Sequence, residues 1–282
     1  MKLAVSNIAW DPAALDEHLG LIRRLGCDGV ELAPSCLWPE PSTVPDEQAR
    51  QAAARIRGLG LEITGFHSLL YTRPDLQLFQ DRQGVQETVR YLKRLVRLCA
   101  AMTGRVLVFG SPRNRIRHGN TAEECLAWAA DAFRQLAEDA SGNGVVLCIE
   151  PLAPQETEFI QSSEEGMALV RAVGHPNFGL HLDAKAMAGA GEDPDTVLPR
   201  YAGQVQHFHV GDAGLAPPGS TGTVDHPRFG NALRRSGYTG YVSIEMRRGF
   251  GPSRDVVTRS IAYVREHYFG HAPVAATTGG SA

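Results

Sequence analysis

The sequence predicts an α/β protein that folds as a single (β/α)8 TIM barrel, and three observations favour this fold. Its length of 282 residues suits one barrel of this type, which needs about 250 residues. Eight short apolar runs alternate with longer segments whose apolar residues recur at helical spacing. No linker divides the chain, so we expect one catalytic domain over residues 1–270. A Pro/Ala/Thr/Gly/Ser-rich run over 271–282 predicts a disordered, flexible tail.

The eight candidate strands are short, apolar and rich in β-branched residues, which is typical of a parallel sheet covered by helices on its outside. A closed barrel fits eight such units better than an open doubly wound sheet, although periodicity alone leaves the open sheet as an alternative. The predicted strands are residues 2–9, 28–33, 61–66, 105–110, 144–150, 177–183, 204–210 and 241–246.

Helices are expected between these strands, and two of them carry clear signals. In residues 82–102, apolar side chains recur every three or four positions, which predicts a helix with one buried face. Thr121 followed by Glu124 forms a capping-box pattern, which predicts that the next helix begins there.

Charge and cysteine content narrow the classes of function. A formal charge of −3 and a pI near 6.4 provide no broad basic field, so we expect no nucleic-acid partner. Five cysteines without a CxxC pair, mostly in apolar runs, are typical of a cytoplasmic protein. The opening apolar segment is interrupted by Asn7 and Asp11, which argues against a signal peptide or a membrane span.

Four successive candidate strands end in side chains that bind metal ions: Glu150, Asp183, His209 and Glu245. Because the carboxyl ends of barrel strands meet at one face, these side chains are expected to converge. For any one of them alone, a local salt bridge is the simpler interpretation; for all four we favour one divalent metal ion. The mainly oxygen donor set suits Mn²⁺ best among the ions considered, with Mg²⁺ or Co²⁺ as alternatives.

These motifs resemble the ligand set of the xylose-isomerase-like sugar isomerase and epimerase superfamily, whose ketose 3-epimerases carry Glu, Asp, His and Glu on strands five to eight. The spacing is similar: 33 residues (183 − 150), then 26 (209 − 183), then 36 (245 − 209). The resemblance implies a metal ion that holds the substrate's carbonyl and neighbouring hydroxyl. It also implies that Glu150 and Glu245 exchange protons with the carbon between them, through an enediolate.

The resemblance therefore implies a small sugar, sugar derivative or keto-inositol as the substrate, and the related barrels make a homo-oligomer an expectation by analogy. Two positions depart from the epimerase pattern. Ala186 stands where those enzymes carry a substrate-binding histidine, and Leu215 stands where they carry an arginine. Substrate binding is thus expected to differ from that of the ketohexose epimerases.

Further substrate-binding candidates lie at or near the predicted strand ends. They are Trp10, His67, Ser111, His181, Lys185 and Arg247, with Glu31 as a weaker candidate. If the strand ending at Asp183 stays extended, His181 and Lys185 point to the same face as that residue. The loop arginines at positions 113, 115 and 117 are interpreted as solvated surface, and Arg247 is preferred for binding an anionic group.

Three other functions remain open. A lyase or dehydratase begins with the same proton abstraction and is distinguished by loss of water. A phosphodiesterase resembling endonuclease IV binds three zinc ions rather than one metal ion. A non-catalytic sugar-binding barrel predicts binding without solvent hydrogen exchange.

Overall fold

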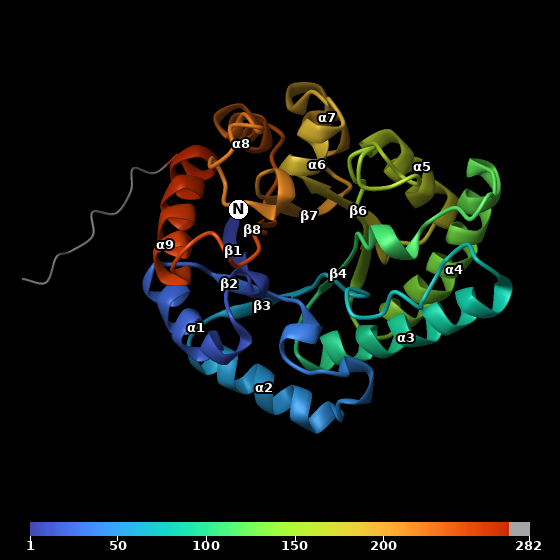
Figure 1. The fold of residues 1–282 in the computed structure, drawn as a ribbon, viewed down its shortest axis with the longest axis horizontal. Helices are drawn as coiled ribbons and strands as arrows, with labels where there is room; N and C mark the ends of the chain where they lie inside the picture. Colours follow the sequence, from blue (N-terminus) through green and yellow to red (C-terminus); the bar gives the residue numbers. More distant parts are fainter. Residues whose placement is uncertain (271–282) are drawn as a thin grey trace, which may run out of the picture.

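In the computed structural model, which describes residues 1–270, the eight predicted strands form a closed barrel in the order β1 to β8 (Figure 1). Every neighbouring pair is parallel, and β1 pairs with β8 to complete the ring, so the open-sheet alternative is wrong. The predicted tail over 271–282 lies outside the described residues. The strands are β1 (Lys2–Ser6), β2 (Gly29–Leu32), β3 (Glu62–Phe66), β4 (Val106–Phe109), β5 (Val146–Ile149), β6 (Phe178–Asp183), β7 (Val205–Val210) and β8 (Tyr241–Ile244).

Helices surround the barrel in the order of the chain (Figure 1). They are α1 (Leu15–Arg24), α2 (Asp46–Gly58), α3 (Arg82–Ala101), α4 (Ala122–Ser141), α5 (Ser163–Val173), α6 (Ala184–Gly189), α7 (Pro194–Tyr201), α8 (His226–Arg235) and α9 (Ser253–Val264). The predicted helix over 82–102 is confirmed as α3, and the predicted capping box between Thr121 and Glu124 is present. No helix in residues 1–270 combines the length and apolar character that a bilayer crossing requires.

The apolar core lies between the strands and the surrounding helices. Phe109 of β4, Phe133 of α4 and Phe178 of β6 are buried there, with adjacent ring centroids 5.1 Å apart. Burying rings of this size removes enough apolar surface from water to anchor the helices on the sheet.

The barrel interior is, by contrast, unusually polar. Glu31, His181, His207 and Ser243 all point into it and are 0–1% exposed. Bulky branched residues dominate the interior of most barrels, and a buried carboxylate or imidazole is costly unless it has a partner. Part of the barrel interior is therefore a polar network instead of an apolar core, and this network lies directly beneath the predicted site.

Candidate metal centre and active site

The structure places the four predicted metal ligands together at the carboxyl ends of β5 to β8. The register of β6 and β7 sets Asp183 beside His209, while Glu150 and Glu245 follow directly after β5 and β8. One donor atom from each of the four side chains lies within 4.8 Å of the others, and all four are at least nine-tenths buried. Side chains up to 95 residues apart (245 − 150) thus form one cluster.

The donor atoms in this cluster fit a divalent cation. Asp183 Oδ2 and His209 Nδ1 are both buried, point among the carboxyl groups and form no hydrogen bond; their charged neighbours are Lys185 Nζ at 3.4 Å and Glu245 Oε2 at 3.5 Å. Buried polar atoms without hydrogen bonds are costly, and three carboxyl groups this close cannot all ionise unless a positive charge lies between them. A bound cation removes both penalties.

Glu31 orients His209 from below the cluster. Glu31 Oε2 accepts hydrogen bonds from His209 Nε2 at 2.9 Å and from Ser243 Oγ at 2.6 Å, and its Oε1 lies 3.2 Å from His207 Nε2. Burial opposes ionisation, but His209 and His207 hold the pKa of Glu31 well below its usual range. An ionised acceptor at Nε2 holds a proton on that atom, so Nδ1 is the nitrogen that faces the other ligands and can bind a cation.

His67 acts on Glu245 in a similar way. Its Nδ1 lies 3.0 Å from Glu245 Oε1, and its Nε2 lies 2.5 Å from Ser6 Oγ. The Glu245 carboxylate can only accept, so Nδ1 carries the proton and donates to it, and the Ser6 hydroxyl donates to Nε2. Sequence reasoning made His67 a substrate contact. It does line the cavity, but its imidazole is engaged with Glu245.

The two glutamates are held in opposite protonation states. Burial, followed by the charge of Glu245, raises the pKa of Glu150 to about 8. Burial opposes ionisation of Glu245 as well, but His209 and His67 keep the pKa of that carboxyl well below its usual range. Before any cation binds, Glu150 therefore carries a proton at neutral pH and Glu245 does not. Carboxyl pairs with separated pKa values are typical of acid and base roles.

Two residues fix the position of Glu150. Arg115 is fully buried and donates from Nη1 to the Glu150 carbonyl oxygen at 2.9 Å and from Nε to Thr157 Oγ1 at 3.2 Å. The interpretation of Arg115 as solvated surface is wrong, because the loop after β4 folds its guanidinium under β5. On the other side, a Cβ atom on Gly110 would overlap Glu150 Oε2, so only glycine leaves the carboxylate in place.

We expect Gly110→Ala to weaken Mn²⁺ binding at least about tenfold without unfolding the protein. The added methyl group meets only the end of the Glu150 side chain, which can move away from the cluster. The measurement is Mn²⁺ titration by calorimetry, with the melting temperature recorded in parallel. Gly58→Ala is the control, because no atom lies within 4 Å of its added Cβ. Unchanged Mn²⁺ affinity in Gly110→Ala would contradict the assigned position of Glu150.

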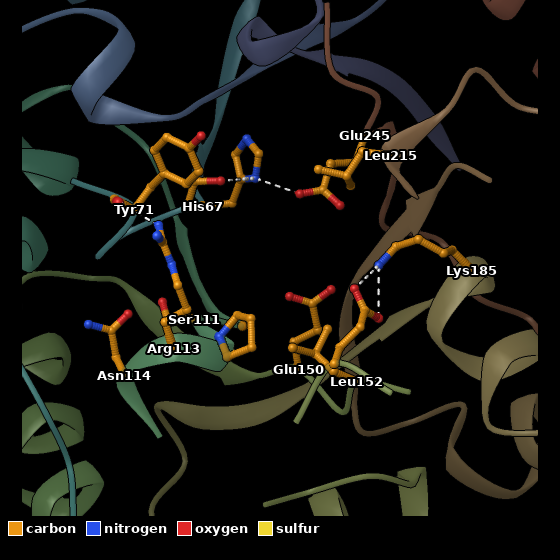
Figure 2. Close-up of a pocket in the computed structure, with 14 residues that line it drawn as sticks. His67, Tyr71, Ser111, Arg113, Asn114, Glu150, Leu152, Lys185, Leu215 and Glu245 are labelled. Carbon is orange, nitrogen blue, oxygen red and sulfur yellow. Dashed lines mark hydrogen bonds and ion pairs between the residues drawn. The ribbon is translucent and has the colours of Figure 1, made fainter. Parts of the chain in front are cut away.

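A cavity of about 380 Å³ opens above the cluster, and Glu150 and Glu245 form part of its wall (Figure 2). Its volume is within the usual range for small-molecule sites. Of the six non-glycine residues with positive φ in the described chain, three line it: Ser68, Ser111 and Leu215. Such backbone conformations are strained and concentrate at functional sites, which supports this cavity as the active site.

Lys185 reaches the cavity by a different route from the one expected. The strand ends at Asp183 and α6 begins at once, so the extended chain on which the shared face of Asp183 and Lys185 depended is not present. The side chain is nevertheless buried, with 8% of its surface exposed, and it points into the cavity (Figure 2). Its Nζ lies 3.4 Å from both Asp183 Oδ2 and Glu156 Oε1. Burial works against the charge, but Asp183 and Glu245 raise the pKa of Lys185, so it stays protonated.

The other predicted substrate contacts divide into two groups. Ser111 lines the cavity, and Arg247 lines a second cavity beside it. Trp10 is fully buried and stacks on His18, while His181 is fully buried with its Nε2 3.8 Å behind Glu150 Oε1. Neither lines the cavity in the described part of the chain, so their assignment as substrate contacts stays a prediction that this geometry does not support. Both were placed near strand ends correctly, but they point into packed interior.

Comparisons with known proteins agree with the barrel fold. A sequence model of the family described as "Xylose isomerase-like TIM barrel" matches residues 19–267. The chain is similar to D-psicose 3-epimerase of Ruminiclostridium cellulolyticum, with 29% identity over 255 residues that cover 87% of this chain and 83% of that protein. It is also similar to a putative hydroxypyruvate isomerase of Homo sapiens, with 25% identity over 275 residues that cover 93% and 94% of the two chains.

Solved structures show the same fold. D-Psicose 3-epimerase from Clostridium cellulolyticum, crystallised with D-tagatose, matches with a TM-score of 0.80 and 20% identity, covering 95% of this chain and 99% of that one. A 3-keto-D-glucoside 4-epimerase from E. coli, in its apo form, matches with a TM-score of 0.78 and 20% identity, covering 94% and 99%.

Proposed function

The chain belongs to the xylose isomerase-like TIM barrel family, and on that basis we propose that it is a metal-dependent sugar isomerase or epimerase. The observation that carries the proposal is geometric: Glu150, Asp183, His209 and Glu245 form one buried group that could hold a metal ion, and its two glutamates line one cavity. The two curated relatives are named as an epimerase and an isomerase, which supports the same class of reaction.

One divalent cation, Mn²⁺ by preference, is assigned to Glu150, Asp183, His209 and Glu245. When bound, it supplies a positive charge that stabilises the enediolate formed when a proton leaves the carbon beside a carbonyl. Two further three-residue groups in the described chain share His209. In one of them, Glu31 and His67 are already hydrogen-bonded to His209, Ser6 and Glu245, which favours one ion over the three of an endonuclease IV-like enzyme.

In the proposed reaction, ionised Glu245 takes the proton from the substrate carbon, and His67 holds its carboxylate in position. Glu150 delivers its proton to the opposite face of that carbon in an epimerisation, or to the neighbouring carbon in an isomerisation. Lys185 donates a hydrogen bond to a substrate oxygen, since it lines the cavity as a permanent cation. In the epimerisation the proton that leaves the carbon is matched by one that returns to it. In the isomerisation a proton also passes from the neighbouring hydroxyl to the former carbonyl oxygen, so the substrate keeps its composition.

Metal binding should release protons, and its affinity should rise with pH. Burial lowers the basicity of His209, but Glu31 and Glu245 raise its pKa well above the usual value, so the ring carries two protons at neutral pH. A cation at Nδ1 displaces one of them, whereas Glu150 has to bind the ion and still keep the proton that it delivers in the reaction. One proton is therefore released, and each pH unit gained below the pKa of His209 strengthens binding by about tenfold. Calorimetry in two buffers of different ionisation enthalpy measures the release. Binding without proton release would contradict the assignment of Nδ1 as a ligand.

The proposed function is tested by a screen for deuterium incorporation from solvent. Ketoses, aldoses, keto-inositols and their phosphates are incubated in D₂O with the protein, with and without Mn²⁺. We expect metal-dependent incorporation next to the carbonyl with no change in composition. Loss of water would instead identify a lyase or dehydratase, and binding without exchange would identify a sugar-binding barrel.

A further inference from the structure

A second cavity adjoins the proposed active site. It measures about 450 Å³ and lies beside the cavity of about 380 Å³ that contains the two glutamates. The two share three lining residues: Ser68, Tyr71 and Leu215. We call them the outer and inner cavities. Because they share a wall, a ligand seated over the metal ligands can extend into the outer cavity.

The outer cavity differs from the inner one in charge. Arg247 and Arg248, from the loop after β8, both line it, and no Asp or Glu does so within residues 1–270. Most of the remaining lining is apolar or small, including Ile8, Pro12 and Ala33. The inner cavity is more acidic, since three carboxyl groups line it beside two cations: Glu150, Glu156 and Glu245, with Arg113 and Lys185. A ligand that spans both is therefore expected to carry its negative charge at the outer end.

Arg247 is exposed to solvent, and three contacts of this residue restrict where its guanidinium lies. Its Nε donates to the Gly214 carbonyl at 3.2 Å, its backbone N–H donates to the Leu215 carbonyl at 2.8 Å, and the Phe250 ring lies 4.8 Å from its central carbon. These contacts leave its two terminal nitrogens available as donors. A fixed guanidinium fork matches the oxygens of a phosphate or a carboxylate.

The three residues that line both cavities also have features typical of a binding surface. Ser68 and Leu215 have positive φ angles of 51° and 56°, and the Tyr71 ring is 69% exposed. The Arg113 guanidinium lies 5.5 Å from that ring (Figure 2), adding a third cation at the rim. An exposed aromatic ring between polar groups suits a sugar that passes over it.

We propose that the outer cavity is a subsite for an anionic substituent, a phosphate or a carboxylate, on a carbohydrate whose reacting carbon lies in the inner cavity. This inference rests on the proposed function for the reacting end, but the subsite itself does not require catalysis. Contacts to a group remote from the reacting carbon can orient the substrate. They also offer contacts in place of the histidine and the arginine that the epimerase pattern has at positions 186 and 215, where this chain has Ala186 and Leu215.

The test uses metal-free protein, so that a probe anion cannot bind to a metal ion. Inorganic phosphate is titrated and followed by phosphorus NMR, and acetate is titrated in parallel by protein NMR to separate phosphate from carboxylate recognition. The variant is R247Q/R248Q, and R90Q is the control because Arg90 is exposed on α3. E150Q tests whether anion binding is independent of the pair Glu150 and Glu245.

We expect the double variant to raise the Kd of the better-bound anion at least about tenfold, with no change in R90Q or E150Q. If the double variant binds phosphate and acetate as tightly as the wild type does, the subsite is overturned. In the exchange assay, the double variant should raise KM for D-fructose 6-phosphate more than for D-fructose. If no sugar exchanges deuterium while anion binding still depends on Arg247 and Arg248, the subsite stands and the proposed reaction fails.

Discussion

Replacing Glu245 with Gln is expected to reduce metal-dependent deuterium exchange by about 10²-fold to 10⁴-fold, the usual contribution of a positioned acid or base. The amide cannot take a proton from carbon, yet it nearly matches the carboxylate in shape. Glu245 is the ionised member of the pair, since His209 and His67 keep its pKa low against the effect of burial. Glu150→Gln should give a loss of similar size, because the amide cannot deliver the proton that Glu150 carries.

Both residues are also proposed ligands, so the assay must separate loss of metal from loss of proton transfer. The measurement is exchange at saturating Mn²⁺, with bound metal determined by elemental analysis on the same samples. Glu47→Gln is the control, because Glu47 is exposed on α2. Full exchange in either variant, or a loss accounted for by missing metal alone, would remove that residue from the acid and base pair.

The fold could be predicted from the sequence because a (β/α)8 barrel repeats one short-range pattern. Each strand is a brief apolar run, and each helix shows its own periodicity, so local patterns suffice to count eight units. The convergence of Glu150, Asp183, His209 and Glu245 then follows from topology, since parallel strands end at the same face. No long-range contact had to be known in advance.

The network beneath the cluster could not be predicted in this way. Glu31 and His209 are 178 residues apart, and their hydrogen bond depends on the strand register and on side-chain rotamers. His67 and Glu245 are separated by the same number of residues. The sequence indicated that both Glu31 and His67 lie near strand ends. It carried no signal for which of their neighbours they would contact.

Arg115 and Lys185 show a second limit of predicting the site from the sequence. Arginines in a polar loop are usually solvated, and nothing local distinguishes buried Arg115 from exposed Arg113. The position of Lys185 depended on where the strand stops, and Asp183 ends it by accepting a hydrogen bond from the Lys185 backbone N–H at 2.8 Å, as a helix N-cap. Strand ends set by side-chain capping are the least certain part of a prediction from sequence.

Glu31→Gln is expected to weaken Mn²⁺ binding by about 10-fold to 100-fold, although Glu31 is not a proposed ligand. Its carboxylate receives the His209 Nε2 proton at 2.9 Å and is itself fully buried. A neutral amide at this position no longer favours the His209 tautomer in which Nδ1 carries no proton. The substitution also removes a negative charge from beside the His209 imidazole. Exchange activity should recover at high Mn²⁺ concentration, because the proton-transferring pair is intact.

Ser243→Ala provides the matched comparison for Glu31→Gln. It removes the 2.6 Å hydrogen bond from Ser243 Oγ to Glu31 Oε2 but leaves the carboxylate and its bond to His209 in place. If Glu31 acts by orienting His209, Ser243→Ala should weaken Mn²⁺ binding much less than Glu31→Gln, even where both lower the melting temperature. Equal losses of affinity in the two variants would mean that the buried network supports the site only through general stability. An unchanged Mn²⁺ Kd in Glu31→Gln would leave His209 oriented by its ring packing alone.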